Sequence, residues 1–137
     1  MANEKEAFLE GNTFAVVTDG SKPAMKWVVD EFMKRGKKVS VIKVSAGDAD
    51  VSGIPDYVEK IIIGVTAIDP ADLIIPLRER GFKNFWIHWR TDTPAVREMC
   101  DEEGITCITG KCPMMYLGKD LSIHGLHRAI AKLTGNY

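Results

Sequence analysis

Short apolar runs rich in valine and isoleucine alternate along this chain with segments whose apolar residues recur at helical spacing. Ala24, Trp27, Val28 and Phe32 are spaced as one face of a helix that follows the first run. The pattern therefore predicts β-strands that alternate with amphipathic α-helices. The five expected strands are residues 13–18, 39–44, 60–65, 83–89 and 105–109.

Turn residues mark where the predicted helices begin and end. Ser21 is the expected N-cap of the first helix, with Pro23 in its first turn, and Asp69-Pro70 and Thr93-Pro94 open the next two. An interior proline, Pro76, is expected to kink the second helix or to delay its start. Each helix is expected to stop at the glycine that follows it, which is Gly36, Gly81 or Gly104.

This alternation predicts one α/β domain with a parallel sheet that is covered by helices on both faces. We expect a three-layer Rossmann-like domain with strand order 3-2-1-4-5 and a core from about residue 12 to 116. Residues 45–56 are small and acidic, which favours a loop between strands two and three. Residues 120–134 have apolar positions at helical spacing, which predicts a C-terminal helix that packs on the domain or on a partner, as in a homo-oligomer.

Composition narrows the possible partners and the compartment. Lysine and arginine total 18 against 19 for aspartate and glutamate, so no charge bias favours nucleic acid or an anionic membrane. No apolar run reaches the ~18 residues of a membrane span, and the polar start does not resemble a secretory signal. The three cysteines, Cys100, Cys107 and Cys112, show no Cys-x-x-Cys spacing, so we expect reduced thiols in a cytoplasmic protein.

Candidate binding residues follow the strands, and in a parallel sheet the carboxyl ends of the strands share one edge. After strand one, Thr18 and Asp19 lead into Gly20, Ser21 and Lys22, where a helix N-terminus offers backbone N–H groups to an anion.

At the end of strand two, Lys43 stands where NAD-binding proteins place a carboxylate, so it is suited to a phosphorylated ribose, with Val44 offering an apolar surface to adenine. A solvated strand end is the alternative interpretation of Lys43.

The later strands add hydroxyl groups, a cation, a histidine and a cysteine. Thr66 and Thr91 could donate hydrogen bonds to a ligand, and Arg90 could pair with phosphate. His88 is either a hydrogen-bonded interior residue or part of the crevice lining, and Cys112 is either a reactive thiol or a small buried side chain. The candidate ligand-binding set is completed by Val65, which precedes Thr66.

No catalytic set or metal site is expected. No nucleophile or carboxylate lies near His88 in the sequence to complete a catalytic group. His124 and His127 lie three residues apart on the predicted last helix but lack a third ligand. We therefore expect no activity from this chain on its own.

The order of these motifs resembles the small stand-alone CoA-binding domain family, whose Rossmann-like fold is shared with succinyl-CoA ligase alpha subunits. Members tend to read Val-Val-Gly-Ala-Ser-x-x-Pro at the first turn, Val-Asn-Pro after strand two, Trp-x-Gln at strand four and Arg-Cys after strand five. The corresponding residues here are Val16–Pro23, Ile42–Val44, Trp86–His88 and Lys111–Met115, within a match from Asn12 to Tyr116.

The resemblance implies non-catalytic binding of coenzyme A or an acyl-CoA, as a carrier, sensor or sequestering protein. Thr18 and Asp19 depart from the family's Gly-Ala pair, and Asp19 would repel phosphate unless it points away or caps the helix. Two alternatives stay open. One is an NADP-binding redox protein or sensor that uses Lys43 and Cys112, and the other is an interaction module with a decayed nucleotide crevice.

Overall fold

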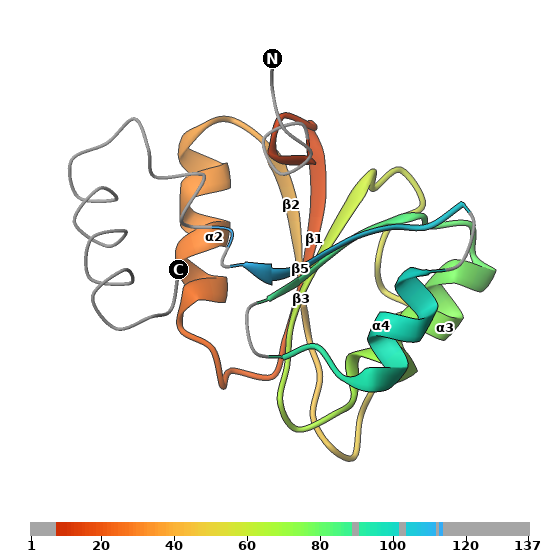
Figure 1. Ribbon diagram of the computed structural model, residues 1–137. Coiled ribbons are helices and arrows are strands. Elements are labelled where there is room, and N and C mark those ends of the chain that lie inside the picture. Colours follow the sequence, from red (N-terminus) through yellow and green to blue (C-terminus); the bar gives the residue numbers. More distant parts are fainter. Residues whose placement is uncertain (1–7, 89–90, 102–103, 112, 114–137) are drawn as a thin grey trace.

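Five parallel strands form one sheet at the centre of the computed structural model, which describes residues 8–88, 91–101, 104–111 and 113 (Figure 1). The strand order is β2-β1-β3-β4-β5. The α/β parallel-sheet prediction is therefore confirmed. The strands are β1 (Thr13–Thr18), β2 (Lys38–Lys43), β3 (Lys60–Gly64), β4 (Asn84–His88) and β5 (Thr106–Lys111).

The predicted strand order was wrong for the first three strands. We expected β2 to lie between β1 and β3, but β3 pairs with β1 and β2 forms the edge. The side chains explain this order. Ile61, Ile62 and Ile63 of β3 are fully buried and need cover on both faces, whereas every position of β2 is exposed or half-buried.

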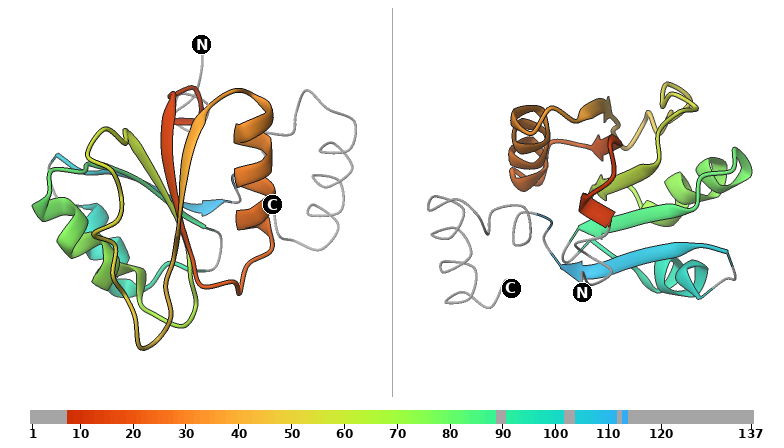
Figure 2. Two further views of the ribbon diagram at one scale, coloured as in Figure 1. Left: turned by 180° about the vertical axis from the view of Figure 1, so that it is seen from behind. Right: turned by 90° about the horizontal axis from the view of Figure 1, so that it is seen from above.

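Among the described residues, helices cover the two faces unequally, as Figure 2 shows from above. Helix α2 (Ala24–Lys34) packs on one face, and α3 (Pro70–Glu79) and α4 (Pro94–Cys100) pack on the other. Two apolar clusters fill the spaces between these layers. Phe14, Ile62 and Trp86 meet α2, and the alternate strand residues meet α3 and α4. Each central strand is thus buried on both sides.

The predicted starts of α3 and α4 are confirmed, and that of α2 is not. The Asp69 carboxylate accepts a hydrogen bond from the Ala71 N–H at 3.0 Å, and the Thr93 hydroxyl oxygen accepts one from the Val96 N–H at 3.3 Å. Helix α2 instead begins after Pro23 without a side-chain cap, and the Ser21 hydroxyl donates to Asp19. The expected glycine stops occur in the left-handed conformation, and α3 continues through Pro76.

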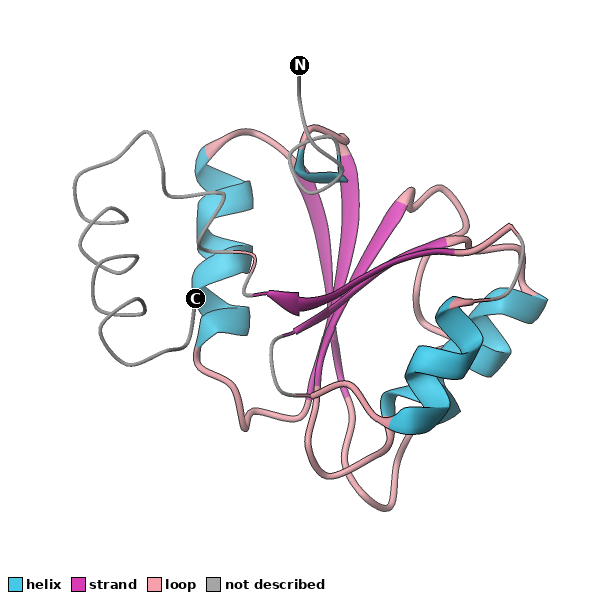
Figure 3. Cartoon of the chain, in the orientation of Figure 1, coloured by secondary structure: helices cyan, strands magenta, loops and turns pink. Residues whose placement is uncertain are grey.

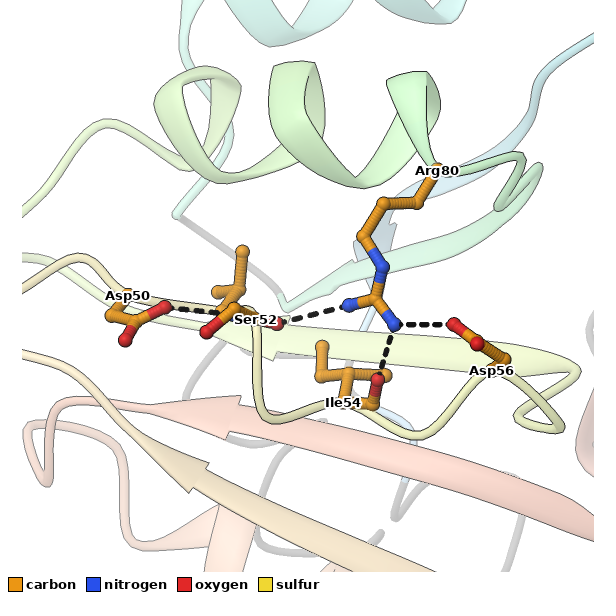
Figure 4. A network of polar contacts seen from close by, with 6 residues as sticks. Asp50, Ser52, Ile54, Asp56 and Arg80 are labelled. Atoms are coloured by element: carbon orange, nitrogen blue, oxygen red, sulfur yellow. Dashed lines mark hydrogen bonds and ion pairs between the residues drawn. The ribbon is translucent and has the colours of Figure 1, made fainter.

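A long loop between β2 and β3 replaces a crossover helix, as the composition of residues 45–56 predicted (Figure 3). Val51, Ile54 and Val58 anchor this loop in the core. The Arg80 guanidinium, just after α3, donates to the backbone oxygens of Val51 at 3.3 Å and of Ile54 (Figure 4). It also pairs with the exposed Asp56 at 2.7 Å. Arg80 therefore fastens the loop to α3.

A disulfide joins Cys100, at the end of α4, to Cys107 in β5. Their Cα atoms lie 5.4 Å apart, which is within the normal range for a disulfide. The expectation of reduced thiols was wrong for this pair, because β5 runs beside the end of α4. None of the helices in the described ranges is both long and apolar enough to cross a membrane.

Candidate functional site

The carboxyl ends of β1, β2 and β3 lie side by side. Thr18 is in register with Lys43 of β2 and with Gly64 of β3. The chain leaves β1 toward α2 on one face and leaves β3 toward α3 on the other. The gap between these two departing turns is the topological switch point, where open α/β sheets bind their ligands.

The Asp19 carboxylate fills this switch point. One oxygen, Oδ2, accepts hydrogen bonds from the backbone N–H groups of Thr66 at 2.8 Å and Ala67 at 2.7 Å. The other, Oδ1, accepts from the backbone N–H of Ser21 at 2.9 Å and from its hydroxyl. Asp19 thus joins the turn before α2 to the turn before α3.

These bonds hold Asp19 in its charged form. Burial alone would raise the pKa of this carboxyl, but the hydrogen bonds from Ser21, Ala67 and Thr66 together lower it well below its usual range. Distances of this length are typical of charge-assisted hydrogen bonds. A fixed negative charge therefore occupies the position where a ligand anion would be expected.

A groove of about 510 Å³ lies beside the switch point, between α2 and the edge strand β2. Its volume falls within the usual range for small-molecule sites. Three lysines and a floor of apolar side chains give it both positive charge and apolar area. The lining residues are Thr18, Gly20, Lys22, Pro23, Met25, Lys26, Val29, Val41 and Lys43.

Two glycines allow α2 to begin this close to the sheet. Gly20 has φ +85°, a left-handed conformation, and its N–H donates to the Thr18 hydroxyl oxygen at 3.0 Å. Gly64 packs against Met25 so closely that an added Cβ would lie 2.4 Å from the Met25 sulfur. The absence of a side chain at Gly64 therefore allows the first turn of α2 to lie this close to β3.

The structure brings together four of the predicted residues, Thr18, Gly20, Lys22 and Lys43, as groove lining. It places Val44 and Val65 elsewhere, because both are buried in the core on the opposite face of the sheet. Sequence reasoning missed Val41 and Lys26. The period of two along β2 could have found Val41, since it shares a face with Lys43 and not with Val44.

The remaining hydroxyl candidates differ in what they can offer a ligand. The Ser21 hydroxyl donates to Asp19, and the buried Thr91 hydroxyl donates to the His88 backbone oxygen at 2.7 Å. Thr66 is exposed, but its backbone N–H is already bound by Asp19. The two hydrogen-bonded hydroxyls hold turns in place, so they would not donate to a ligand without rearrangement.

His88 is an interior residue at the carboxyl end of β4, 4% exposed. Its Nδ1 has no hydrogen-bond partner among the residues that the structure describes. Burial lowers the pKa of His88 to about 4, and the positive charge of Lys22 contributes to the same shift. The imidazole is therefore neutral at physiological pH.

Several predicted features lie outside the described residues. They are Arg90, Cys112, His124, His127 and the C-terminal helix expected over 120–134. Within the described ranges, no group of three or more histidine, cysteine, aspartate or glutamate side chains is arranged to hold a metal ion.

Comparison with known proteins finds likeness at the level of structure. No protein-family model matches the sequence, and no significant match was found among curated proteins. The crystal structure of Prb, the PH1109 protein redesigned for binding, aligns with TM-score 0.60 at 20% identity, over 86% of this chain and 92% of that one. A conserved hypothetical protein from Pyrococcus furiosus aligns with TM-score 0.53 at 17% identity, over 74% of this chain and 96% of its own length. This chain therefore shares the α/β parallel-sheet fold of these small proteins.

Proposed function

We propose that this protein binds coenzyme A or an acyl-CoA without catalysing a reaction on it. The phosphorylated ADP portion would occupy the groove between α2 and β2. The role would be to carry, sense or sequester the coenzyme.

One observation supports this proposal above the others: the groove combines Lys22, Lys26 and Lys43 with the apolar side chains of Val29 and Val41. The ADP portion of CoA has a matching composition, with a pyrophosphate, a ribose phosphate and an apolar adenine face. Lysines can pair with the phosphates as point charges, and the valines can cover the base. The order of motifs described above supports the same ligand.

NADP is the second candidate, because it also carries a phosphorylated ribose that Lys43 could bind. The two candidates carry the ribose phosphate on different hydroxyls and differ in everything beyond the pyrophosphate, so direct comparison of CoA with NADP separates them. Two further ligands test the contact to the ribose phosphate itself. NAD lacks the ribose phosphate of NADP, and dephospho-CoA lacks that of CoA.

The test is calorimetric titration of the purified protein with CoA, acetyl-CoA, dephospho-CoA, NADP and NAD. CoA and acetyl-CoA should bind, and dephospho-CoA and NADP should bind more weakly than CoA. Binding should weaken with added salt, because the lysine contacts are exposed to solvent. Binding of NADP alone would favour the second candidate, and binding of none would leave only an interaction module.

Lysine variants localise the site. Lys43→Ala should weaken CoA binding about tenfold, the usual loss for one charged contact. Lys83→Ala is the matched control, because Lys83 is an exposed lysine directly before β4, at the amino ends of the strands and away from the groove. An equal loss in both variants would mean that general charge, and not this groove, attracts the ligand.

A further inference from the structure

The observed strand order puts the switch point between β1 and β3, and sheets of this order bind the phosphate of ligands such as FMN at that point. In this protein the N–H groups of Thr66 and Ala67 face the switch point from the turn before α3. The Ser21 N–H faces it from the turn before α2. Three backbone donors thus converge from two helix-leading turns, which is an arrangement suited to an anion.

All three donors are already used by the Asp19 carboxylate. The distances of 2.7 to 2.9 Å leave no room for a second acceptor between carboxylate and donor. The hydrogen bonds also keep Asp19 charged, so a phosphate approaching the switch point would meet a fixed negative group. Both steric occupation and charge repulsion therefore oppose phosphate binding there.

We propose that Asp19 is a specificity-determining residue, which closes the switch point to phosphate and restricts phosphorylated ligands to the lysine groove. Ligands whose phosphate must lie between the two turns, as FMN does in sheets of this order, are excluded. Ligands whose phosphates can lie along Lys22, Lys26 and Lys43 are admitted. The assignment of the groove rests on the proposed function, but the closure by Asp19 is tested independently of it.

The probe is inorganic pyrophosphate, titrated by calorimetry into the wild-type protein and into Asp19→Ala. The variant frees the three N–H donors, so its pyrophosphate affinity should rise at least about tenfold, the effect of one charge-assisted hydrogen bond. Amide NMR signals of Thr66 and Ala67 should shift on binding in the variant and stay unchanged in the wild type.

Asp19→Asn is the matched control, because its side-chain oxygen can still accept from Thr66 and Ala67 while the charge is gone. It should gain less affinity than Asp19→Ala. A gain without shifts at Thr66 and Ala67 would overturn the proposed closure. An equal gain in the two variants would overturn occupation of the donors as its cause. If circular dichroism shows that the alanine variant is unfolded, Asp19→Ser can restore the bond from Ser21 and carries the same expectation.

The two proposals fail separately. Wild-type protein that does not bind CoA refutes the proposed function, whatever the variant does with pyrophosphate. An Asp19→Ala variant that binds pyrophosphate no better than wild type refutes the closure, whether or not CoA binds in the groove.

Discussion

Arg80 should be among the most important polar side chains for the stability of this fold, because it fastens the loop that replaces a crossover helix. Arg80→Met keeps much of the apolar stem and removes the guanidinium. The change removes the hydrogen bonds that Arg80 donates to the backbone oxygens of Val51 and Ile54, and the Val51 oxygen keeps the one that it accepts from the Ile54 N–H at 3.2 Å. A hydrogen bond to a charged group contributes about 1.5–3 kcal/mol.

Two features make the expected loss at Arg80 smaller than the sum of two such hydrogen bonds. The bond to Val51 is long at 3.3 Å, and the Arg80 side chain is 29% exposed, so water can replace part of what is lost. We therefore expect the free energy of unfolding to fall by about 2–3 kcal/mol, equivalent to a melting temperature lower by roughly 8 °C. Urea denaturation followed by tryptophan fluorescence and far-UV circular dichroism measures the change.

Asp56→Ala provides the control, because it breaks only the ion pair and leaves the carbonyl contacts. The Asp56 side chain is 95% exposed, so its loss should cost less than about 0.5 kcal/mol. The reasoning is refuted if Arg80→Met loses less than about 0.5 kcal/mol, or if the two variants lose equal amounts.

Two further predictions concern the disulfide and His88. The disulfide closes a loop across a sequence separation of 7, so its reduction should lower the free energy of unfolding by about 2.5 kcal/mol. Urea denaturation with and without dithiothreitol measures this loss. A Cys100→Ser, Cys107→Ser double variant is the control, because it should not respond to the reductant. A wild-type curve unchanged by dithiothreitol would contradict this expectation. The pKa of His88 falls from 6.5 to about 4 on folding, so between these two pH values the unfolded state binds more protons than the folded state. The free energy of unfolding should therefore drop by ~3 kcal/mol as the pH falls from 6.5 to 4. His88→Gln should remove this part of the pH dependence, and an identical pH profile in wild type and variant would exclude His88 as its source.

Local chemistry made the elements of this fold predictable. Asp69 and Thr93 cap helices through groups two or three residues away, so their roles follow from neighbouring sequence alone. Strand order depends instead on which strand most needs burial on both faces. The continuous apolar run Ile61–Ile63 already indicated that β3 needs cover on both faces, but the predicted order followed the usual Rossmann arrangement.

The candidate site was predictable in part for the same reason. Lys22 and Lys43 follow strands, so the carboxyl edge of a parallel sheet was enough to bring them together. The role of Asp19 depends on Thr66 and Ala67, which lie 47 and 48 residues further along the chain, and no local pattern indicates such a contact. Val44 lies in the core on the other face of β2 from Lys43, and the period of two along the strand was the signal that separates it from Val41.

A structure of the protein with bound CoA tests the central claim most directly, which is that phosphate binds in the lysine groove and not at the switch point. The account predicts phosphate oxygens within hydrogen-bond distance of Lys22, Lys26 or Lys43, with the Asp19 carboxylate still bound to Thr66 and Ala67. Phosphate bound to the Thr66 and Ala67 N–H groups, with Asp19 displaced, would contradict it.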